Sequence, residues 1–252
     1  MKAKFSLALM LAAVVLLVFS MPVQASKVDD QIVSSAKNSY VFKNYLKNDD
    51  IKIQSKDGAV TLTGTVSEES HKTLARETVA SLSGVKKVDN RLEVKGAPLA
   101  ATNSDAWLIT KVKTTLLFHS SVSASATEVN AKDGIVTLRG DAASQAQKDL
   151  TTEYAKDVDG VKDVKNEMVV SAPSKKTQTA GDKIDDASIT GLAKMTLLYH
   201  RSTSALNTSV TTQNGVVTLT GKAKNTAEKD LATKYVKDVN GVKSVNNRMT
   251  IE

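Results

Sequence analysis

The chain has 252 residues, a formal net charge of +7 and no cysteine. The lack of cysteine excludes disulfides, thiolate metal sites, cysteine nucleophiles and a lipid-modified N-terminal cysteine. Three histidines leave little material for metal or triad chemistry, and an aromatic content of 4% means that the core is built mainly from aliphatic side chains. The composition therefore favours a binding or structural protein over an enzyme and predicts no cofactor.

The first 25 residues have the pattern of a secretory signal peptide. Lys2 and Lys4 precede an apolar run over residues 5–19, and small residues stand at the two positions before Ser26 that a signal peptidase reads. The run is shorter than the roughly 20 residues of a membrane-spanning helix, which disfavours the alternative of an uncleaved anchor. We expect residues 1–25 to be removed, leaving a periplasmic protein without an integral membrane segment.

One sequence unit then appears three times. Residues 57–64 (DGAVTLTG) recur as residues 133–140 (DGIVTLRG) and 214–221 (NGVVTLTG). A further glycine follows the first glycine of each copy by 26 residues, and an asparagine stands six residues later, at Asn90, Asn166 and Asn247. Constant spacing within copies that are 76 and 81 residues apart indicates separate folded units rather than a solenoid. We expect domains at 27–96, 104–171 and 184–252, with linkers at 97–103 and 172–183.

Each unit is predicted to begin with a helix and a β-hairpin. Asp29, Asp105 and Asp186 each stand 29 residues before the first glycine, where we expect them to cap the N-terminus of the first helix. The Asp-Gly or Asn-Gly pair predicts a type I′ turn between two strands. The second strand alternates, with Val60 and Leu62 predicted inside and threonines outside, so that one face of the sheet is solvated.

A second helix and a third strand complete the unit. Ser144 with Gln147, and Asn225 with Glu228, have the spacing of capping boxes. The second glycine of each copy is expected at the αL position that ends this helix, and the repeated asparagine is expected to satisfy backbone groups beside the last strand. The fold class is thus α+β, an α-β-β-α-β unit with two helices on one face of a three-stranded mixed sheet. Turn and cap roles are assigned to Gly58, Gly64, Gly84, Gly134, Gly140, Gly160, Gly215, Gly221 and Gly241.

The hairpin motif, the second helix and the following run GVKxVxN together resemble the BON domain of bacterial periplasmic and outer-membrane-associated proteins. The whole mature chain resembles the osmotically inducible type of periplasmic BON protein. The resemblance implies an α/β sandwich without known catalysis that associates with phospholipid or envelope surfaces. It also implies a role in osmotic or envelope stress, and in some members a chaperone-like role.

Trp107 breaks the repeat, since the equivalent positions hold Gln31 and Ser188. Polar equivalents predict an exposed or marginal helix face, which also carries Lys111 one turn later and has Lys113 close by. A tryptophan flanked by lysines suits the headgroup layer of an anionic bilayer, and the resemblance extends to BON members that bind anionic phospholipid through their first helix. Trp107, Lys111 and Lys113 are therefore the candidate lipid-binding residues. The alternative is that Trp107 packs against the linker or a neighbouring unit and that the lysines are only solvated.

Other site chemistry is poorly supported. His119 and His200 occupy equivalent positions at the end of the first helix, where a cation suits the helix dipole, and unit 1 has Lys43 there. The histidines have no acidic or histidine cluster at metal-ligand spacing, so no metal site and no catalytic residue is predicted. The glycine motif lacks the Lys-Ser/Thr ending of a phosphate loop, and the charge pattern does not suit nucleic acid.

The sequence therefore predicts a non-enzymatic periplasmic protein of envelope or osmotic stress that binds phospholipid surfaces through three BON domains. The alternative is a periplasmic chaperone-like binder of unfolded or envelope proteins. An enzyme, such as a hydrolase that uses a histidine, is the least favoured class because no nucleophile, base and orienting acid occur at recognisable spacing.

Overall fold

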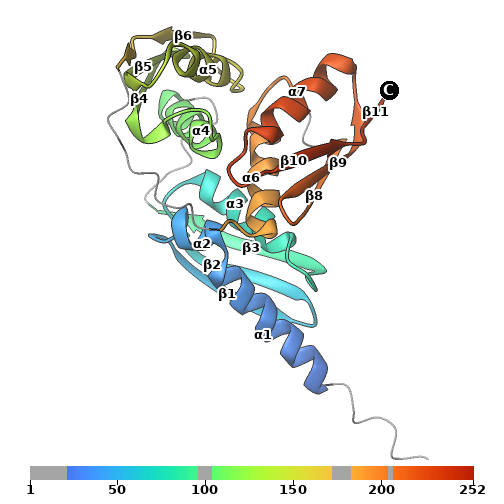
Figure 1. The fold of residues 1–252 in the computed structure, drawn as a ribbon. Helices are drawn as coiled ribbons and strands as arrows, with labels where there is room; N and C mark the ends of the chain where they lie inside the picture. Colours follow the sequence, from blue (N-terminus) through green and yellow to red (C-terminus); the bar gives the residue numbers. More distant parts are fainter. Residues whose placement is uncertain (1–21, 96–103, 172–182, 204–206) are drawn as a thin grey trace, which may run out of the picture.

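The structure is a computed structural model, which describes residues 22–95, 104–171, 183–203 and 207–252 (Figure 1). Most of the predicted signal peptide lies outside the described residues. Its last four residues belong to helix α1 (Pro22–Asn38), which continues across the expected cleavage point after Ala25. In the described part of the chain, no helix combines the length and the apolar character needed to cross a membrane.

The three units repeat one topology. Unit 1 contains α1, α2 (Tyr40–Asn44), β1 (Asp50–Lys56), β2 (Ala59–Val66), α3 (Glu69–Ala80) and β3 (Lys87–Val94). Unit 2 contains α4 (Asp105–Phe118), β4 (Thr127–Lys132), β5 (Ile135–Ala142), α5 (Gln145–Lys156), β6 (Asp163–Asn166) and β7 (Val169–Val170). Unit 3 contains α6 (Asp186–Tyr199), β8 (Thr208–Gln213), β9 (Val216–Ala223), α7 (Thr226–Lys237), β10 (Ser244–Asn247) and β11 (Thr250–Ile251). The middle strand of each sheet is antiparallel to the strand before it and parallel to the last strand, which confirms the predicted α+β class.

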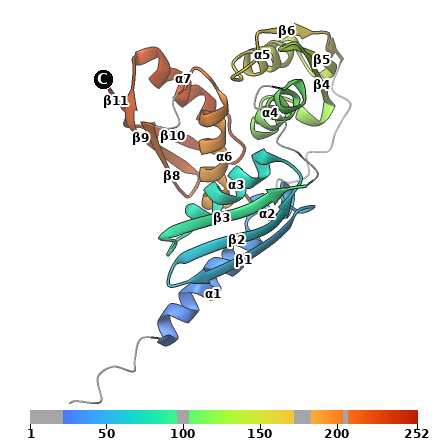
Figure 2. The ribbon, with the colours of Figure 1, turned by 180° about the vertical axis from the view of Figure 1, so that it is seen from behind.

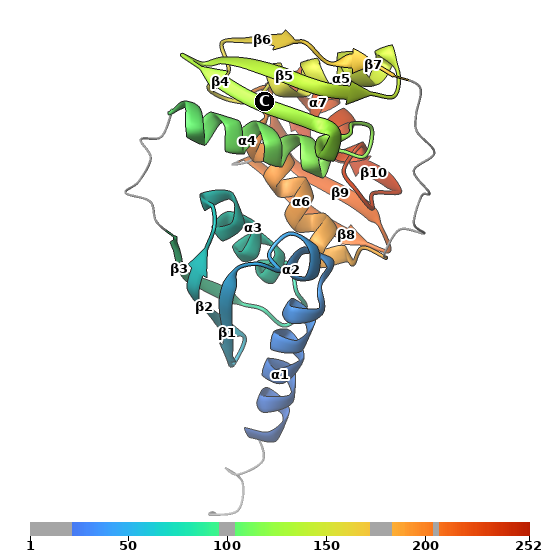
Figure 3. The ribbon, with the colours of Figure 1, turned by 90° about the vertical axis from the view of Figure 1, so that its left-hand side faces the viewer.

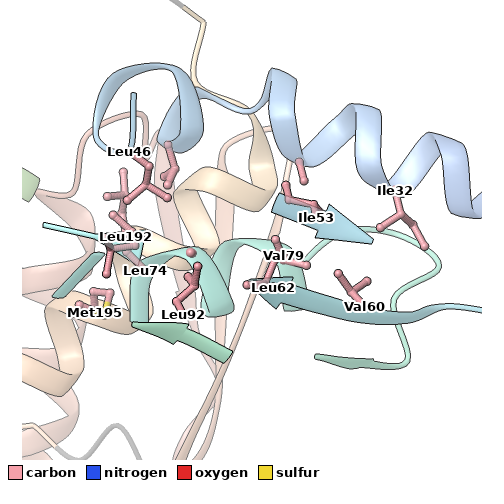
Figure 4. Close-up of a cluster of buried hydrophobic side chains, with 14 of the residues drawn as sticks. Ile32, Leu46, Ile53, Val60, Leu62, Leu74, Val79, Leu92, Leu192 and Met195 are labelled. Atoms are coloured by element: carbon pink, nitrogen blue, oxygen red, sulfur yellow. The ribbon is translucent and has the colours of Figure 1, made fainter. Parts of the chain in front are cut away.

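The predicted alternation places the core. Val60 and Leu62 of β2 are buried between the sheet and the helices, and the equivalent residues of β5 and β9 are also buried. In unit 1 they meet Ile32 of α1 and Leu74 of α3 (Figure 4). The inward rows of apolar side chains thus hold both helices on one face of each sheet.

The conserved spacing of aspartate and hairpin has a different cause from the one predicted. The N-caps of α4 and α6 are Ser104 and Asp185, one residue earlier than expected, and Asp29 lies within α1, so the assignment of these aspartates as N-caps is wrong. Asp105 instead accepts hydrogen bonds from the backbone N–H groups of Asp133 and Gly134, at 2.9 and 3.1 Å. Asp29 and Asp186 bind their hairpin turns in the same way. The aspartate therefore ties the start of the first helix to a turn 29 residues away.

The second helices follow the predicted start but not the predicted end. Ser144 and Asn225 accept hydrogen bonds from the backbone N–H groups three residues later, as N-caps do. Helices α3, α5 and α7 end at C-cap residues with right-handed backbone, and Gly84, Gly160 and Gly241 follow three residues beyond these caps. These glycines therefore belong to the turn before the last strand and do not end the helix.

The repeated asparagines fasten the last strand, as predicted. The side-chain amide of Asn166 donates to the carbonyl of Lys148 at 2.9 Å, and its oxygen accepts from the N–H of Met168. Asn90 and Asn247 make the equivalent bonds. Each asparagine thus joins the second helix to the strand that follows it.

The units pack on one another through their helices. Helix α6 is buried along most of its length and runs beside α3 of unit 1 and α4 of unit 2 (Figures 2 and 3). Leu192 and Met195 of α6 enter the core of unit 1, where Phe118 of unit 2 also packs (Figure 4). A helix that is apolar on all sides must be covered on all sides, and neighbouring units supply that cover. The expectation of three units joined only by linkers therefore needs correction, because each has its own sheet but they share buried contacts.

Candidate functional site: the contact between units 2 and 3

The predicted lipid-binding residues lie on α4 without forming an open basic patch. Lys113 is exposed, Trp107 is half-buried, and Lys111 is only 6% exposed. The ammonium of Lys111 lies 3.2 Å from a carboxylate oxygen of Asp159, 4.4 Å from the centre of the Trp107 ring and 5.4 Å from the ring centre of Tyr199 in unit 3. Burial lowers the pKa of Lys111, and the hydrogen bond to Asp159 opposes that shift. The charge of Lys111 is therefore engaged within the protein.

Trp107 packs locally. A β-carbon placed on Gly160 would lie 3.7 Å from the Trp107 ring and 3.5 Å from Leu108, so the ring covers the turn after α5. The Lys111 ammonium covers another part of the same ring at cation–π distance. Of the two sequence interpretations, this geometry resembles local packing, although the ring contacts its own unit rather than the linker.

Two buried histidines join unit 2 to unit 3. His119 and His200 are the C-cap residues of α4 and α6, and they are 2% and 1% exposed. Their Nε2 atoms lie 3.2 Å apart. Short antiparallel bridges pair His119 with Val239 and Val158 with His200, so each histidine is held against the other unit's second helix end. The sequence placed these histidines at equivalent helix ends but did not bring them together.

Each histidine faces an aspartate of the opposite unit. Nδ1 of His200 lies 3.1 Å from a carboxylate oxygen of Asp157, the C-cap of α5. Nδ1 of His119 lies 3.3 Å from Asp238, the C-cap of α7, in a contact too bent or long to be a regular hydrogen bond. The two contacts are equivalent under the repeat, because both partners of one pair lie 81 residues from their counterparts. Units 2 and 3 therefore meet like the two halves of a symmetric dimer.

Both aspartates are held in the charged form. Burial raises the pKa of Asp238, but hydrogen bonds from His119, Ser121, Tyr154 and Ser120 outweigh it and keep that pKa well below its ordinary value. The pKa of Asp157 is also lowered, because bonds from its own histidine, serine and tyrosine partners outweigh burial. Two carboxylates thus remain ionised beside two imidazoles that water barely reaches.

Two tyrosines enclose the histidine pair. The His119 ring stacks on Tyr154 and the His200 ring on Tyr235, each with ring centres 3.9 Å apart. The hydroxyl of Tyr154 donates to Asp238 at 2.7 Å, and Tyr235 makes the equivalent bond to Asp157. Burial raises the pKa of both tyrosines, so both remain donors. The four rings and two carboxylates form one closed network, which we call the histidine clasp.

Unit 1 cannot form this clasp. Its residues at the histidine, tyrosine and aspartate positions are Lys43, Thr78 and Ser81. Unit 1 instead attaches to α6, where Asp185 accepts from the N–H of Tyr40 at 2.7 Å, and Ser188 accepts from the next N–H at 3.0 Å. The joint presence of histidine, tyrosine and aspartate in two of three copies was the sequence signal for a contact between those two units.

The described residues contain no group of three or more histidine, cysteine or acidic side chains that could hold a metal ion. The clasp offers two imidazole nitrogens alone, with both carboxylates on the opposite side of the rings. Its chemistry is that of proton sharing between two bases and two acids.

Comparison with known proteins places the repeat. The family model described as the BON domain matches residues 28–96, 104–172 and 185–252. Osmotically-inducible protein Y of Escherichia coli is 32% identical over 143 residues, which cover 56% of this chain and 71% of that protein. Outer membrane lipoprotein DolP of Haemophilus influenzae is 31% identical over 109 residues, covering 43% of this chain and 56% of the relative. A 21 kDa hemolysin of Actinobacillus pleuropneumoniae is 28% identical over 142 residues, covering 55% and 73%.

Proposed function

Since the chain belongs to the BON domain family, with a domain match in each of its three units, we propose that it is a non-enzymatic periplasmic protein of envelope or osmotic stress that binds phospholipid surfaces. The family match in all three units is the observation that carries this proposal. The names of two relatives, one osmotically inducible and one an outer membrane lipoprotein, support a place in the bacterial envelope. The signal-peptide pattern of residues 1–25 supports export to the periplasm.

Helix α4 is the candidate contact with lipid. Lys113 is exposed and can approach anionic headgroups, while Trp107 keeps part of its ring at the surface. Lys111 acts differently from the other two, because it holds the Trp107 ring and pairs with Asp159. An interaction that depends on one or two exposed lysines per unit is weak and is screened by salt. We therefore expect binding at low ionic strength that fades as salt is added.

Flotation with vesicles that contain phosphatidylglycerol tests the proposal. The wild-type protein should float at low salt, and Trp107→Ala and Lys113→Glu should each reduce the floating fraction. Lys156→Glu is the matched control, since Lys156 is an exposed lysine of the same unit at the end of α5. Failure of the wild type to float at low salt removes phospholipid binding from the proposal, and equal loss in Lys113→Glu and Lys156→Glu removes α4 as its site.

A chaperone-like function is the second candidate, and one feature favours it. Strand β7 pairs only with β5 among the described strands, and its two residues, Val169 and Val170, are 63% and 46% exposed. An exposed apolar edge can receive an extended peptide as an added strand. Suppression of the aggregation of an unfolded client, reduced in Val169→Lys and without flotation of the wild type, would favour this function over lipid binding.

A further inference from the structure

The histidine clasp constrains how many protons its two rings can carry. A neutral imidazole has one N–H, and a carboxylate can only accept. Asp157 and Asp238 are ionised and face the Nδ1 atoms of His200 and His119, so each Nδ1 favours a hydrogen. If both rings are neutral, two bare Nε2 lone pairs face each other across 3.2 Å. If both rings are fully protonated, two N–H groups face each other instead.

Only the intermediate count gives a bond. With one additional proton, one Nε2–H donates to the other Nε2, and 3.2 Å is an acceptable length for an N–H···N hydrogen bond. We propose that His119 and His200 share a single extra proton as an imidazolium–imidazole pair, and that this proton locks unit 2 to unit 3. The charge of +1 then lies between two carboxylates from opposite units, which stabilise it.

The surroundings of the pair fit a single added charge. From α5 it is faced by Tyr154, Asp157 and Glu153, and from α7 by Tyr235 and Asp238, with Arg201 following α6 beside Asp157. Glu153 is itself paired across the interface with Lys234 of α7. Burial lowers the pKa of His200; Asp157 opposes this shift, and His119 adds to it. Once one ring is charged, a second proton is therefore resisted.

A shared proton makes the docking of the two units depend on pH in both directions. In the separated units the histidines are exposed and titrate near their ordinary pKa of about 6.5. Above that pH, docking requires uptake of a proton, and below it docking requires release of one. The docking constant should fall by up to about tenfold for each pH unit on either side of the maximum. A periplasmic protein with this clasp would open when the medium becomes alkaline or acidic.

A distance measurement in the full chain tests the pH dependence. The protein lacks cysteine, so Lys165→Cys in unit 2 and Lys222→Cys in unit 3 provide two exposed sites for spin labels. The distance distribution should be narrowest near about pH 6.5 and broaden toward about pH 5 and pH 9. In His200→Gln, an amide N–H can donate to His119 without a titrating proton, so the alkaline broadening should vanish.

His71→Gln is the matched control, because His71 pairs with Asp49 in unit 1, away from the clasp. It should leave the wild-type pH profile unchanged, and His119→Gln can replace His200→Gln if that variant does not fold. Nitrogen-15 NMR of the wild-type histidines adds a test that needs no variant, with both Nδ1 atoms protonated and one Nε2 proton shared near neutral pH. A distribution that ignores pH, an alkaline broadening that persists in His200→Gln, or two neutral rings in the docked protein would overturn the proposal.

Discussion

Gly191 of α6 lies so close to Thr78 of α3 that a β-carbon on Gly191 would stand 2.5 Å from Thr78 Oγ1 and 3.2 Å from its backbone nitrogen. Glycine within a helix lowers stability by about 1 kcal/mol relative to alanine, so its presence in α6 calls for a reason. The close crossing of the two helices supplies that reason, because unit 1 and unit 3 approach to backbone distance at this point.

Gly191→Ala should destabilise the protein although it improves helix propensity. The added methyl must displace α3, and overpacking of this kind costs about 1–3 kcal/mol, which exceeds the propensity gain. Denaturant unfolding measures the net effect. Thr78→Ala alone should be nearly neutral, since Thr78 Oγ1 is buried without a hydrogen-bond partner, and it should recover part of the loss in the double variant. A Gly191→Ala protein more stable than the wild type would contradict the close crossing.

Two glycines of unit 2 should differ sharply in their tolerance of alanine. Both have positive φ, which costs a non-glycine residue about 1–2 kcal/mol. A β-carbon on Gly140 would also lie 2.0 Å from the carbonyl oxygen of Ala126, whereas one on Gly160 would meet only side chains at 3.5 Å or beyond. Thermal unfolding should therefore show a much larger loss for Gly140→Ala than for Gly160→Ala. Equal losses would mean that backbone conformation alone sets the preference for glycine.

The aspartate that binds the hairpin turn should make stability depend on acid. Hydrogen bonds from Gly134 and Asp133 lower the pKa of Asp105 below its ordinary 3.8, against a smaller opposing effect of burial. A lowered carboxyl pKa contributes stability above the unfolded value that is lost as pH falls through the folded value. Asp105→Asn should therefore lower the melting temperature at neutral pH, and its difference from the wild type should shrink below about pH 3.

Asp230→Asn is the control for that experiment, since it removes the same charge from an exposed position of α7 without a turn to bind. Its melting temperature should stay close to that of the wild type across the same pH range. If Asp105→Asn and Asp230→Asn behaved alike, the turn contact would contribute nothing beyond net charge.

The repeat unit was predictable because its signals are local. The Asp-Gly turn, the alternation of Val60 and Leu62 and the cap at Ser144 each depend on residues close in sequence, and the structure places them as expected. The role of Asp105 was missed because a caps-based argument considers only the neighbouring N–H groups, while its partners lie 28 and 29 residues away.

The contacts between units were harder to predict. Nothing in the local pattern of His119 distinguishes a solvated helix end from one buried against His200, which lies 81 residues later. The lysine at position 111 likewise looked available for lipid, because sequence spacing does not reveal that Asp159 and Trp107 enclose its ammonium. One usable signal was present, namely that α6 is apolar on every side and therefore needs neighbours.

The contact between Lys111 and Trp107 can be followed by fluorescence, since Trp107 is the only tryptophan. Lys111→Ala should uncover the ring and increase its quenching by acrylamide. Lys113→Ala should leave quenching unchanged, because Lys113 is exposed. Equal quenching in the two variants would show that Lys111 does not cover the ring in solution.

Small-angle X-ray scattering of residues 26–252 tests the central claim that the three units are docked around α6. A compact chain of this length has a radius of gyration of about 17 Å, and we predict a value within a few ångströms of it near neutral pH. A radius above about 25 Å, with the scattering of flexibly linked beads, would contradict the docked arrangement.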